Sequence, residues 1–355
     1  MRRPLLPLAA AMAALLITAA PALACGGLIG PNGAVNLLRT TTFAGYHDGV
    51  EHYVTAFEFA GGGGAFGSIT PLPDIPSKVE RGGDWTLQRL VLETNPVEEA
   101  LLFRLGAATA DAAGEAEVLL EATVDALDIT ILRGGGDEVG LWAKNHGFRL
   151  PPDAPEVLDF YAERSPIFMA AAFDADRAAE QGQAVGDGTP VHLTIPTDNP
   201  WVPLRILGLG KQAAETVQAD VYLLTDEKPA LLPKAGAFAE SAGLILEHSD
   251  AASESLLTDL RSDAGMEWVP DEAWLTKVVV DASADELNFD LAIDASGAGK
   301  PSPVDAGFAP FTENPVPRSP VPLYLVLAAL LIVSVPIGLE RATRAGSARS
   351  PWAGA

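Results

Sequence analysis

The stretch EHYVTAFEFAGGGGAFGSITPL, residues 51–72, contains the clearest fold signal in the chain. Aromatic and β-branched side chains are closely spaced in residues 51–60 and again in residues 66–72, which favours a β-strand in each. The four glycines at 61–64 are typical of a turn. A group of prolines that begins at Pro71 ends the second strand, because proline has no N–H to donate to a sheet. The stretch therefore predicts a hairpin of two neighbouring strands.

The same pattern recurs later in the chain. Residues 167–173 are apolar and are followed by an acidic, glycine-rich loop at 174–188. Residues 191–196 then form a second apolar segment, which runs into a proline. This order of segments predicts a second strand, loop and strand of the same kind.

Two longer stretches, residues 124–174 and 242–281, also resemble each other. In each, a strand leads into an amphipathic helix that ends near a glycine, and a proline, a short helix and an apolar strand follow. In the second stretch Asp271 is expected at the start of the short helix, where the helix dipole favours a carboxylate. We interpret the resemblance as a weak internal duplication with similar halves at 25–165 and 166–294. The expected fold is α+β, a mixed sheet with flanking helices.

The two ends of the chain carry targeting signals. Residues 1–24 combine a basic start, an apolar run and small residues before Cys25, which predicts a secretory signal peptide. Residues 321–339 contain no charge and would span roughly 28 Å as a helix, close to the thickness of a bilayer core. Three arginines follow within residues 340–355, so this tail is expected in the cytoplasm. The chain is predicted to be a single-pass membrane protein with its body outside.

The segment between the body and the membrane helix, residues 295–320, is rich in proline, glycine and alanine. Such a composition predicts a stiff, extended stalk.

The whole chain carries a formal net charge of −24. An acidic surface repels nucleic acid, because phosphate binding depends on clustered Lys and Arg, and this excludes a nucleic-acid partner.

Cys25 is the only cysteine, so no disulfide can form within the chain. Its position directly after the predicted cleavage site allows two outcomes. A lipid-attachment signal has Leu three residues before the cysteine and a small residue two before it, but Ala22 and Leu23 occupy these positions in the opposite order. We expect simple cleavage that leaves Cys25 at the mature N-terminus, with lipidation as the alternative.

Four short segments occur in an order that points to a known family. They are Ala-Cys-Gly-Gly at 24–27, Asn-His-Gly-Phe at 145–148, Ile-Pro-Thr-Asp-Asn-Pro-Trp-Val-Pro-Leu-Arg at 195–205 and Trp-Leu-Thr-Lys at 274–277. Together they resemble the bacterial exported family catalogued as domain of unknown function 2330, over residues 25 to about 281. The resemblance implies an exported protein with a C-terminal membrane helix. Many relatives have a further cysteine soon after the first, which this chain lacks. The family has no established activity, so the resemblance implies no catalytic residue.

The densest group of candidate metal ligands is YHDGVEH, residues 46–52. It offers side chains that suit zinc or another divalent metal, namely His47, Asp48, Glu51 and His52. Asp-Gly at 48–49 is also a typical two-residue turn between strands. In a strand, alternation would send Glu51 and His52 to opposite faces, so we favour the turn over the metal site.

Trp201 is the remaining candidate. Flanked by prolines, it would suit an exposed binding surface, whereas the favoured alternative is a core tryptophan beside a strand that ends at a proline. The Gly-x-Ser-x-Gly nucleophile motif and the His-Glu-x-x-His zinc motif do not occur. The sequence therefore favours a non-catalytic binding or scaffolding protein of the cell envelope, with an envelope protein as its expected partner. The alternative is a metal-dependent envelope enzyme that uses the 46–52 group, with a divalent metal as the only cofactor considered.

Overall fold

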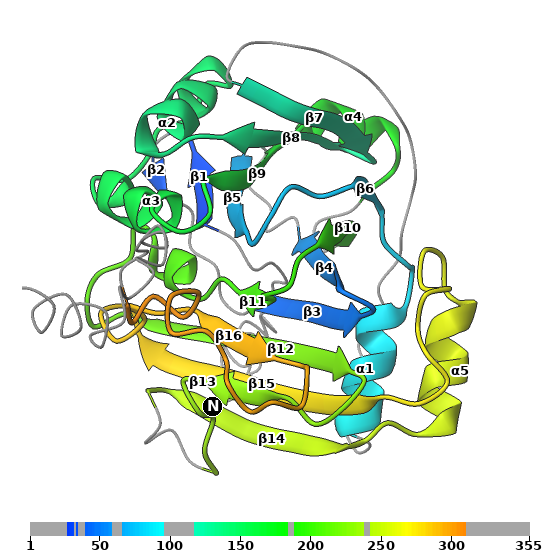
Figure 1. Ribbon diagram of the computed structural model, residues 1–355. Coiled ribbons are helices and arrows are strands. Elements are labelled where there is room, and N and C mark those ends of the chain that lie inside the picture. The colour runs from blue at the N-terminus through cyan, green and yellow to red at the C-terminus, as the bar shows by residue number, and fades with distance from the viewer. Residues whose placement is uncertain are drawn as a thin grey trace, which may run out of the picture. The chain divides into compact units, whose positions relative to one another are not determined.

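The computed structural model describes residues 27–31, 33–34, 40–58, 66–95, 117–183, 188–237 and 242–309. The predicted signal peptide, Cys25, the four-glycine turn, the apolar segment 321–339 and the tail 340–355 lie outside these ranges. Within them the chain forms three β-sheets and five α-helices, and belongs to one compact unit (Figure 1). The fold is α+β with sheet predominating. None of the helices in this part of the chain is both long enough and apolar enough to cross a membrane.

The first sheet has six strands in the order β2-β1-β5-β9-β8-β7, and every neighbouring pair is antiparallel. Its strands are β1 (Gly27–Gly30), β2 (Gly33–Ala34), β5 (Phe66–Leu72), β7 (Glu117–Val124), β8 (Leu127–Arg133) and β9 (Ile167–Phe173).

The second sheet has seven strands in the order β14-β15-β12-β3-β4-β10-β6. It is mixed, because β12 and β3 are parallel while the other pairs are antiparallel. Its strands are β3 (Thr40–His47), β4 (Val50–Glu58), β6 (Lys78–Arg81), β10 (Gly188–Pro196), β12 (Thr216–Thr225), β14 (Leu244–Ala251) and β15 (Trp274–Ser283). A third, short sheet has the order β11-β16-β13 and consists of β11 (Trp201–Val202), β13 (Ala230–Leu232) and β16 (Leu291–Asp294).

The two predicted hairpins are wrong, although their strands are present. β4 lies in the second sheet and β5 in the first, and β9 and β10 are divided in the same way. The strands exchange partners: β4 pairs with β10, and β5 pairs with β9 (Figure 1). Strand propensity is local, whereas the choice of partner depends on which apolar faces can be buried together.

The turn at Asp48-Gly49 is confirmed. It joins β3 to β4 in an antiparallel hairpin, with His47 opposite Val50. Both turn residues have positive φ, 51° at Asp48 and 77° at Gly49. Two left-handed residues in succession are what a two-residue turn of this twist requires, and Asp-Gly adopts them readily.

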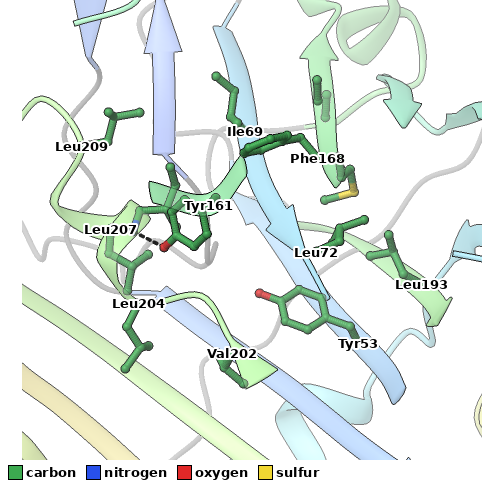
Figure 2. Close-up of a cluster of buried hydrophobic side chains, with 14 of the residues drawn as sticks. Tyr53, Ile69, Leu72, Tyr161, Phe168, Leu193, Val202, Leu204, Leu207 and Leu209 are labelled. Atoms are coloured by element: carbon green, nitrogen blue, oxygen red, sulfur yellow. Dashed lines mark hydrogen bonds between the residues drawn. The ribbon is translucent and has the colours of Figure 1, made fainter. Parts of the chain in front are cut away.

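The five helices lie against the two large sheets. They are α1 (Thr86–Thr94), α2 (Gly136–Asn145), α3 (Ala154–Ala162), α4 (Ala175–Glu180) and α5 (Glu254–Ser262). The main core joins apolar side chains of both large sheets with α2 and α3. Figure 2 shows part of it, where Tyr53 of β4 and Leu193 of β10 face Leu72 of β5 and Phe168 of β9. A second core packs α1 and α5, which contact each other, against the opposite face of the second sheet.

The two stretches of the proposed duplication share one arrangement. β8 and β9 are antiparallel neighbours with α2 and α3 between them in sequence, and β14 and β15 are antiparallel neighbours with α5 between them. The short helix predicted at Asp271 is wrong, because β15 begins at Trp274 and pairs along its length with β12 and β14. Strands from both 25–165 and 166–294 occur in each large sheet, so these halves are not separate units, and the duplication itself stays a prediction.

The start of the predicted stalk packs against the body instead of extending away from it. Ala306 is fully buried, and its carbonyl accepts a hydrogen bond from the Asp290 amide. The guanidinium of Arg164 donates to the carbonyl oxygen of Asp305, and Phe308 stacks on Phe289. Residues 295–309 therefore belong to the folded body, because they contact the buried side chains of Arg164 and Phe289. The proline content of this segment does not predict these contacts.

Candidate functional site

His47 and Asp48 lie at the exposed end of the β3–β4 hairpin. The Nδ1 atom of His47 is 2.6 Å from a carboxylate oxygen of Asp226, which follows β12. Its Nε2 atom is 3.4 Å from a carboxylate oxygen of Asp48. The contact between His47 and Asp226 connects the β3–β4 turn to the end of β12.

His52 lies farther along β4, on the face of the sheet that α1 and α5 cover. Its ring stacks on the indole of Trp268 with the ring centres 3.9 Å apart, and its Nδ1 atom is 3.0 Å from Nε2 of His192 in β10. Burial lowers the pKa of His52 to about 3, with the nearby His192 and His47 adding to the effect. Burial also lowers the pKa of His192 to about 4, against the opposing charge of Glu80. Both rings are therefore neutral at pH 7.

Glu51 faces the opposite side of the sheet and is completely buried. Neither carboxyl oxygen makes a hydrogen bond of good geometry to a described residue, although the backbone of Trp201 lies close enough to favour the charged form. Burial is the larger influence and raises the pKa of Glu51 to about 8. The side chain is thus held mostly protonated at neutral pH.

The four residues of the alternative metal site do not come together. They lie on two faces of β4 and at the hairpin end, because alternation along a strand separates consecutive side chains. Across the described ranges, no three His, Cys, Asp or Glu side chains are grouped so as to hold a metal. The geometry therefore gives no basis for the metal-dependent enzyme.

Trp201 is 2% exposed and belongs to the main core, as the favoured alternative expected. Its ring stacks on Tyr161 with the ring centres 5.9 Å apart, and the guanidinium of Arg164 lies 5.3 Å from it. It supplies no binding surface.

A groove that sequence reasoning missed lies beside β13, between the third sheet and the β14–β15 edge of the second. Its volume is about 660 Å³. Most of the side chains that line it are apolar, including Leu231 and Leu232 of β13 and Leu246 of β14. Pro301 and Pro303 complete its wall from the segment that follows β16. We call this the lysine groove, for the three lysines that also line it: Lys228, Lys234 and Lys300.

The charge of the lysine groove is opposite to that of the chain. The chain has seven lysines in total and 47 acidic residues, yet three of the lysines and no acidic residue line this groove. None of the three forms an ion pair with a described carboxylate, whereas Lys78, Lys211 and Lys277 all do. The groove is therefore a local basic site on an acidic protein.

Hydroxyl side chains also line the groove, from Ser249, Thr276 and Ser302. Thr276 of β15 is 1% exposed, and its Oγ1 atom has no hydrogen-bond partner among the described residues. The hydroxyl of Ser249 accepts a hydrogen bond of 2.9 Å from the indole N–H of Trp274, which leaves its own proton free to be donated. The ammonium of Lys228 lies 5.4 Å from the centre of the same indole ring.

Part of this site is visible in the sequence. The segment KPALLPK, residues 228–234, places two lysines around an apolar core and two prolines. Lys300 and Thr276 are distant in sequence and are brought to the groove only by the pairing of β13 with β16 and of β14 with β15.

Comparison with known proteins identifies the family. The model of the family described as "uncharacterized protein conserved in bacteria (DUF2330)" matches residues 19–293. The chain belongs to this family. The resemblance drawn from the four short segments is thereby confirmed. Among curated proteins, none matches the chain.

Solved structures of baculovirus P35 align with the chain at low similarity. A mutated P35 after caspase cleavage aligns with a TM-score of 0.37 and 8% identity, over 72% of this chain and 99% of that one. A second structure of mutated, cleaved P35 gives 0.35 and 8%, over 74% and 98%. P35 itself gives 0.33 and 9%, over 72% and 96%. Scores this low do not establish a shared fold.

The longest of the family segments, residues 195–205, holds three parts of the fold together. Ile195 pairs with Glu51 across β10 and β4, and the carbonyl of Thr197 accepts a hydrogen bond of 3.0 Å from the Tyr46 hydroxyl. At the other end, the amides of Leu204 and Arg205 donate to the buried carboxylate of Asp290.

Asp290 is the centre of a buried polar network in this family member. It also accepts a hydrogen bond of 2.8 Å from the Tyr161 hydroxyl and pairs with Arg164 at 2.5 Å. The Tyr161 hydroxyl in turn accepts the amide N–H of Ile206, the dashed contact in Figure 2. Burial, followed by the charge of Asp290, raises the pKa of Tyr161. The polar groups of this network are hydrogen-bonded to one another within the core. The family segment 195–205 therefore has a structural role.

Proposed function

We propose that the protein is a non-catalytic binding protein of the cell envelope that takes its ligand in the lysine groove. The body is held outside the membrane by the apolar segment 321–339. The predicted export signal at 1–24 and the uncharged segment near the C-terminus support this location.

The observation that carries the proposal is the size and lining of the lysine groove. Small-molecule sites in proteins are usually about 300–1,000 Å³ and mostly apolar, with a few polar groups that orient the ligand. The groove, at about 660 Å³, has this composition, with leucine and proline walls and the hydroxyls of Ser249, Thr276 and Ser302. It is therefore suited to hold a molecule that has an apolar part.

The groups with strongly shifted pKa values do not lie in this groove. Glu51, His52 and His192 are all at most 9% exposed, and none of them lines it. Shifted pKa values often mark catalytic sites, but here burial among packed core residues is the main cause of each shift. This separation of the titrating groups from the groove favours binding over catalysis.

A single fluorescent label can test binding in the groove. Because Cys25 is the only cysteine, a Cys25→Ser, Ser302→Cys chain carries one thiol, at a residue that lines the groove. The full chain, labelled with a polarity-sensitive dye and reconstituted in phosphatidylcholine nanodiscs, is titrated with 1-octanol. We expect a saturable emission shift. The same label at Ala179→Cys, an exposed position on α4, should show none.

A filling variant completes the test. Leu231→Trp places a large side chain in the groove and should abolish the saturable shift. Leu141→Trp makes the same exchange at an exposed leucine on α2 and should leave the shift intact. An unsaturable response, or one that survives Leu231→Trp, would count against ligand binding in the groove.

A further inference from the structure

We propose that the ligand of the lysine groove is a single-chain amphiphile, with one anionic head group, a phosphate or a carboxylate, and an apolar tail. This inference rests on the proposed function, and it adds the chemical class of the ligand. It follows from three features of the groove that are independent of each other: charge, lining and an unpartnered hydroxyl.

The charge favours an anion in spite of the acidic chain. Lys228, Lys234 and Lys300 line the groove without a described carboxylate partner, and no Asp or Glu lines it. Charges on the rest of the surface are screened over about 8 Å at physiological salt. An anion inside the groove is therefore influenced mainly by the charges around it and less by the net charge of −24. Three lysines line the groove, and the nearby carboxylate of Asp294, which accepts the Lys300 amide N–H, lies outside the lining.

The lining favours an apolar tail attached to that anion. A free inorganic anion would leave the leucine and proline walls in contact with water, whereas an alkyl chain would cover them. Each buried methylene raises affinity by about 4-fold. Leu231, Leu232 and Leu246 thus select for a molecule with a chain, and the lysines select for a charged end.

The hydroxyl of Thr276 gives the head group a further partner. It is buried beside the groove and makes no hydrogen bond within the described chain, and a buried polar group in this state is costly unless something pairs with it. Ser249 keeps a hydroxyl proton to donate, because its oxygen accepts from Trp274. Two hydroxyl donors and three ammonium groups are a donor set that suits phosphate or carboxylate oxygens.

The test compares ligands that share one tail and differ in the head group. The full chain with the Ser302→Cys label, in phosphatidylcholine nanodiscs, is titrated with octyl phosphate, octanoate, 1-octanol and octyltrimethylammonium. We expect octyl phosphate and octanoate to bind at least about 10-fold more tightly than 1-octanol, because charge-assisted hydrogen bonds form only with the anions. Added salt should narrow this gap. Inorganic phosphate should bind more weakly than octyl phosphate.

Lysine variants identify the source of the preference. Lys228→Gln, Lys234→Gln and Lys300→Gln together should remove the advantage of the anions and leave the 1-octanol titration unchanged. Lys144→Gln, at an exposed lysine on α2, serves as the matched control and should keep the advantage. Replacement of all three groove lysines by arginine should keep it as well.

The outcomes separate this inference from the proposed function. If 1-octanol gives no saturable response, ligand binding in the groove fails and the inference fails with it. If 1-octanol binds but the anions bind no more tightly, or the triple glutamine variant keeps their advantage, only the inference is overturned. If the lysines affect sedimentation with phosphatidylglycerol vesicles but not the octyl phosphate titration, the occupant is a bilayer surface, and the inference is again overturned.

Discussion

Glu51 and His52 are consecutive residues of β4, and their side chains face opposite sides of one sheet with opposite pKa shifts. Burial raises the pKa of the Glu51 carboxyl to about 8 and lowers the pKa of the His52 imidazole to about 3. In both cases the neutral form is the one that the interior accepts. The two shifts make the stability of the protein depend on pH in opposite directions.

Glu51→Gln should remove a loss of stability that occurs as pH rises from about 4.5 to about 8. The pKa of Glu51 is raised in the folded state, so its contribution is fully present below about 4.5 and is lost as pH rises towards about 8. The loss is about 1.4 kcal/mol for each pH unit crossed inside this window. Thermal midpoints of the full chain between pH 5 and 8.5 should fall less steeply in Glu51→Gln than in the wild type. Glu163→Gln, on an exposed carboxyl, is the control, and equal slopes in all three proteins would contradict the prediction.

The His52–His192 pair should make the fold sensitive to acid. Both pKa values are lowered in the folded state, so their contribution is present above about 6.5 and is lost as pH falls towards about 4. A His52→Gln, His192→Gln double variant should lose less stability between pH 6.5 and 4 than the wild type. His248→Gln provides a matched exchange outside the pair. An unchanged acid slope in the double variant would contradict the lowered pKa values of the pair.

Asp290→Asn should destabilise the fold strongly. The carboxylate is buried, pairs with Arg164 at 2.5 Å and accepts the Tyr161 hydroxyl, so its loss leaves a cation without its partner in the core. Breaking such a pair from one side costs about 3–5 kcal/mol. Urea unfolding of the full chain measures the change. Asp285→Asn, at an exposed carboxylate close by in sequence, should stay within about 0.5 kcal/mol of the wild type.

Two glycine substitutions should act in opposite directions. The indole of Trp268 occupies the place of a Cβ at Gly45, so Gly45→Ala should displace the ring that covers His52 and cost about 1–3 kcal/mol. At Gly140, inside α2, a Cβ would meet only the Leu150 side chain at 3.7 Å. Gly140→Ala should therefore raise the free energy of unfolding by about 0.5–1 kcal/mol. Urea unfolding of both variants checks the two signs, and a stabilising Gly45→Ala would place the Trp268 ring elsewhere.

Sequence patterns predicted the candidate site only in part. Alternation along a strand correctly separated Glu51 from His52, and the favoured interpretation of Trp201 correctly placed it in the core. The groove was missed because Lys300 and Thr276 join the segment 228–234 only through strand pairing. Side chains that converge from distant segments leave no spacing pattern in a single sequence.

The sequence by itself determined which segments become strands and where the turn between β3 and β4 lies. These depend on local backbone preference, and Asp48-Gly49 adopts the two left-handed residues of its turn at little cost wherever the hairpin is placed. Only the tertiary structure decided that β4 pairs with β10 while β5 pairs with β9, and that three lysines share one groove on an acidic protein. The physical reason is that partner choice follows from burying both faces of each strand at once, and this is a property of the whole packed core.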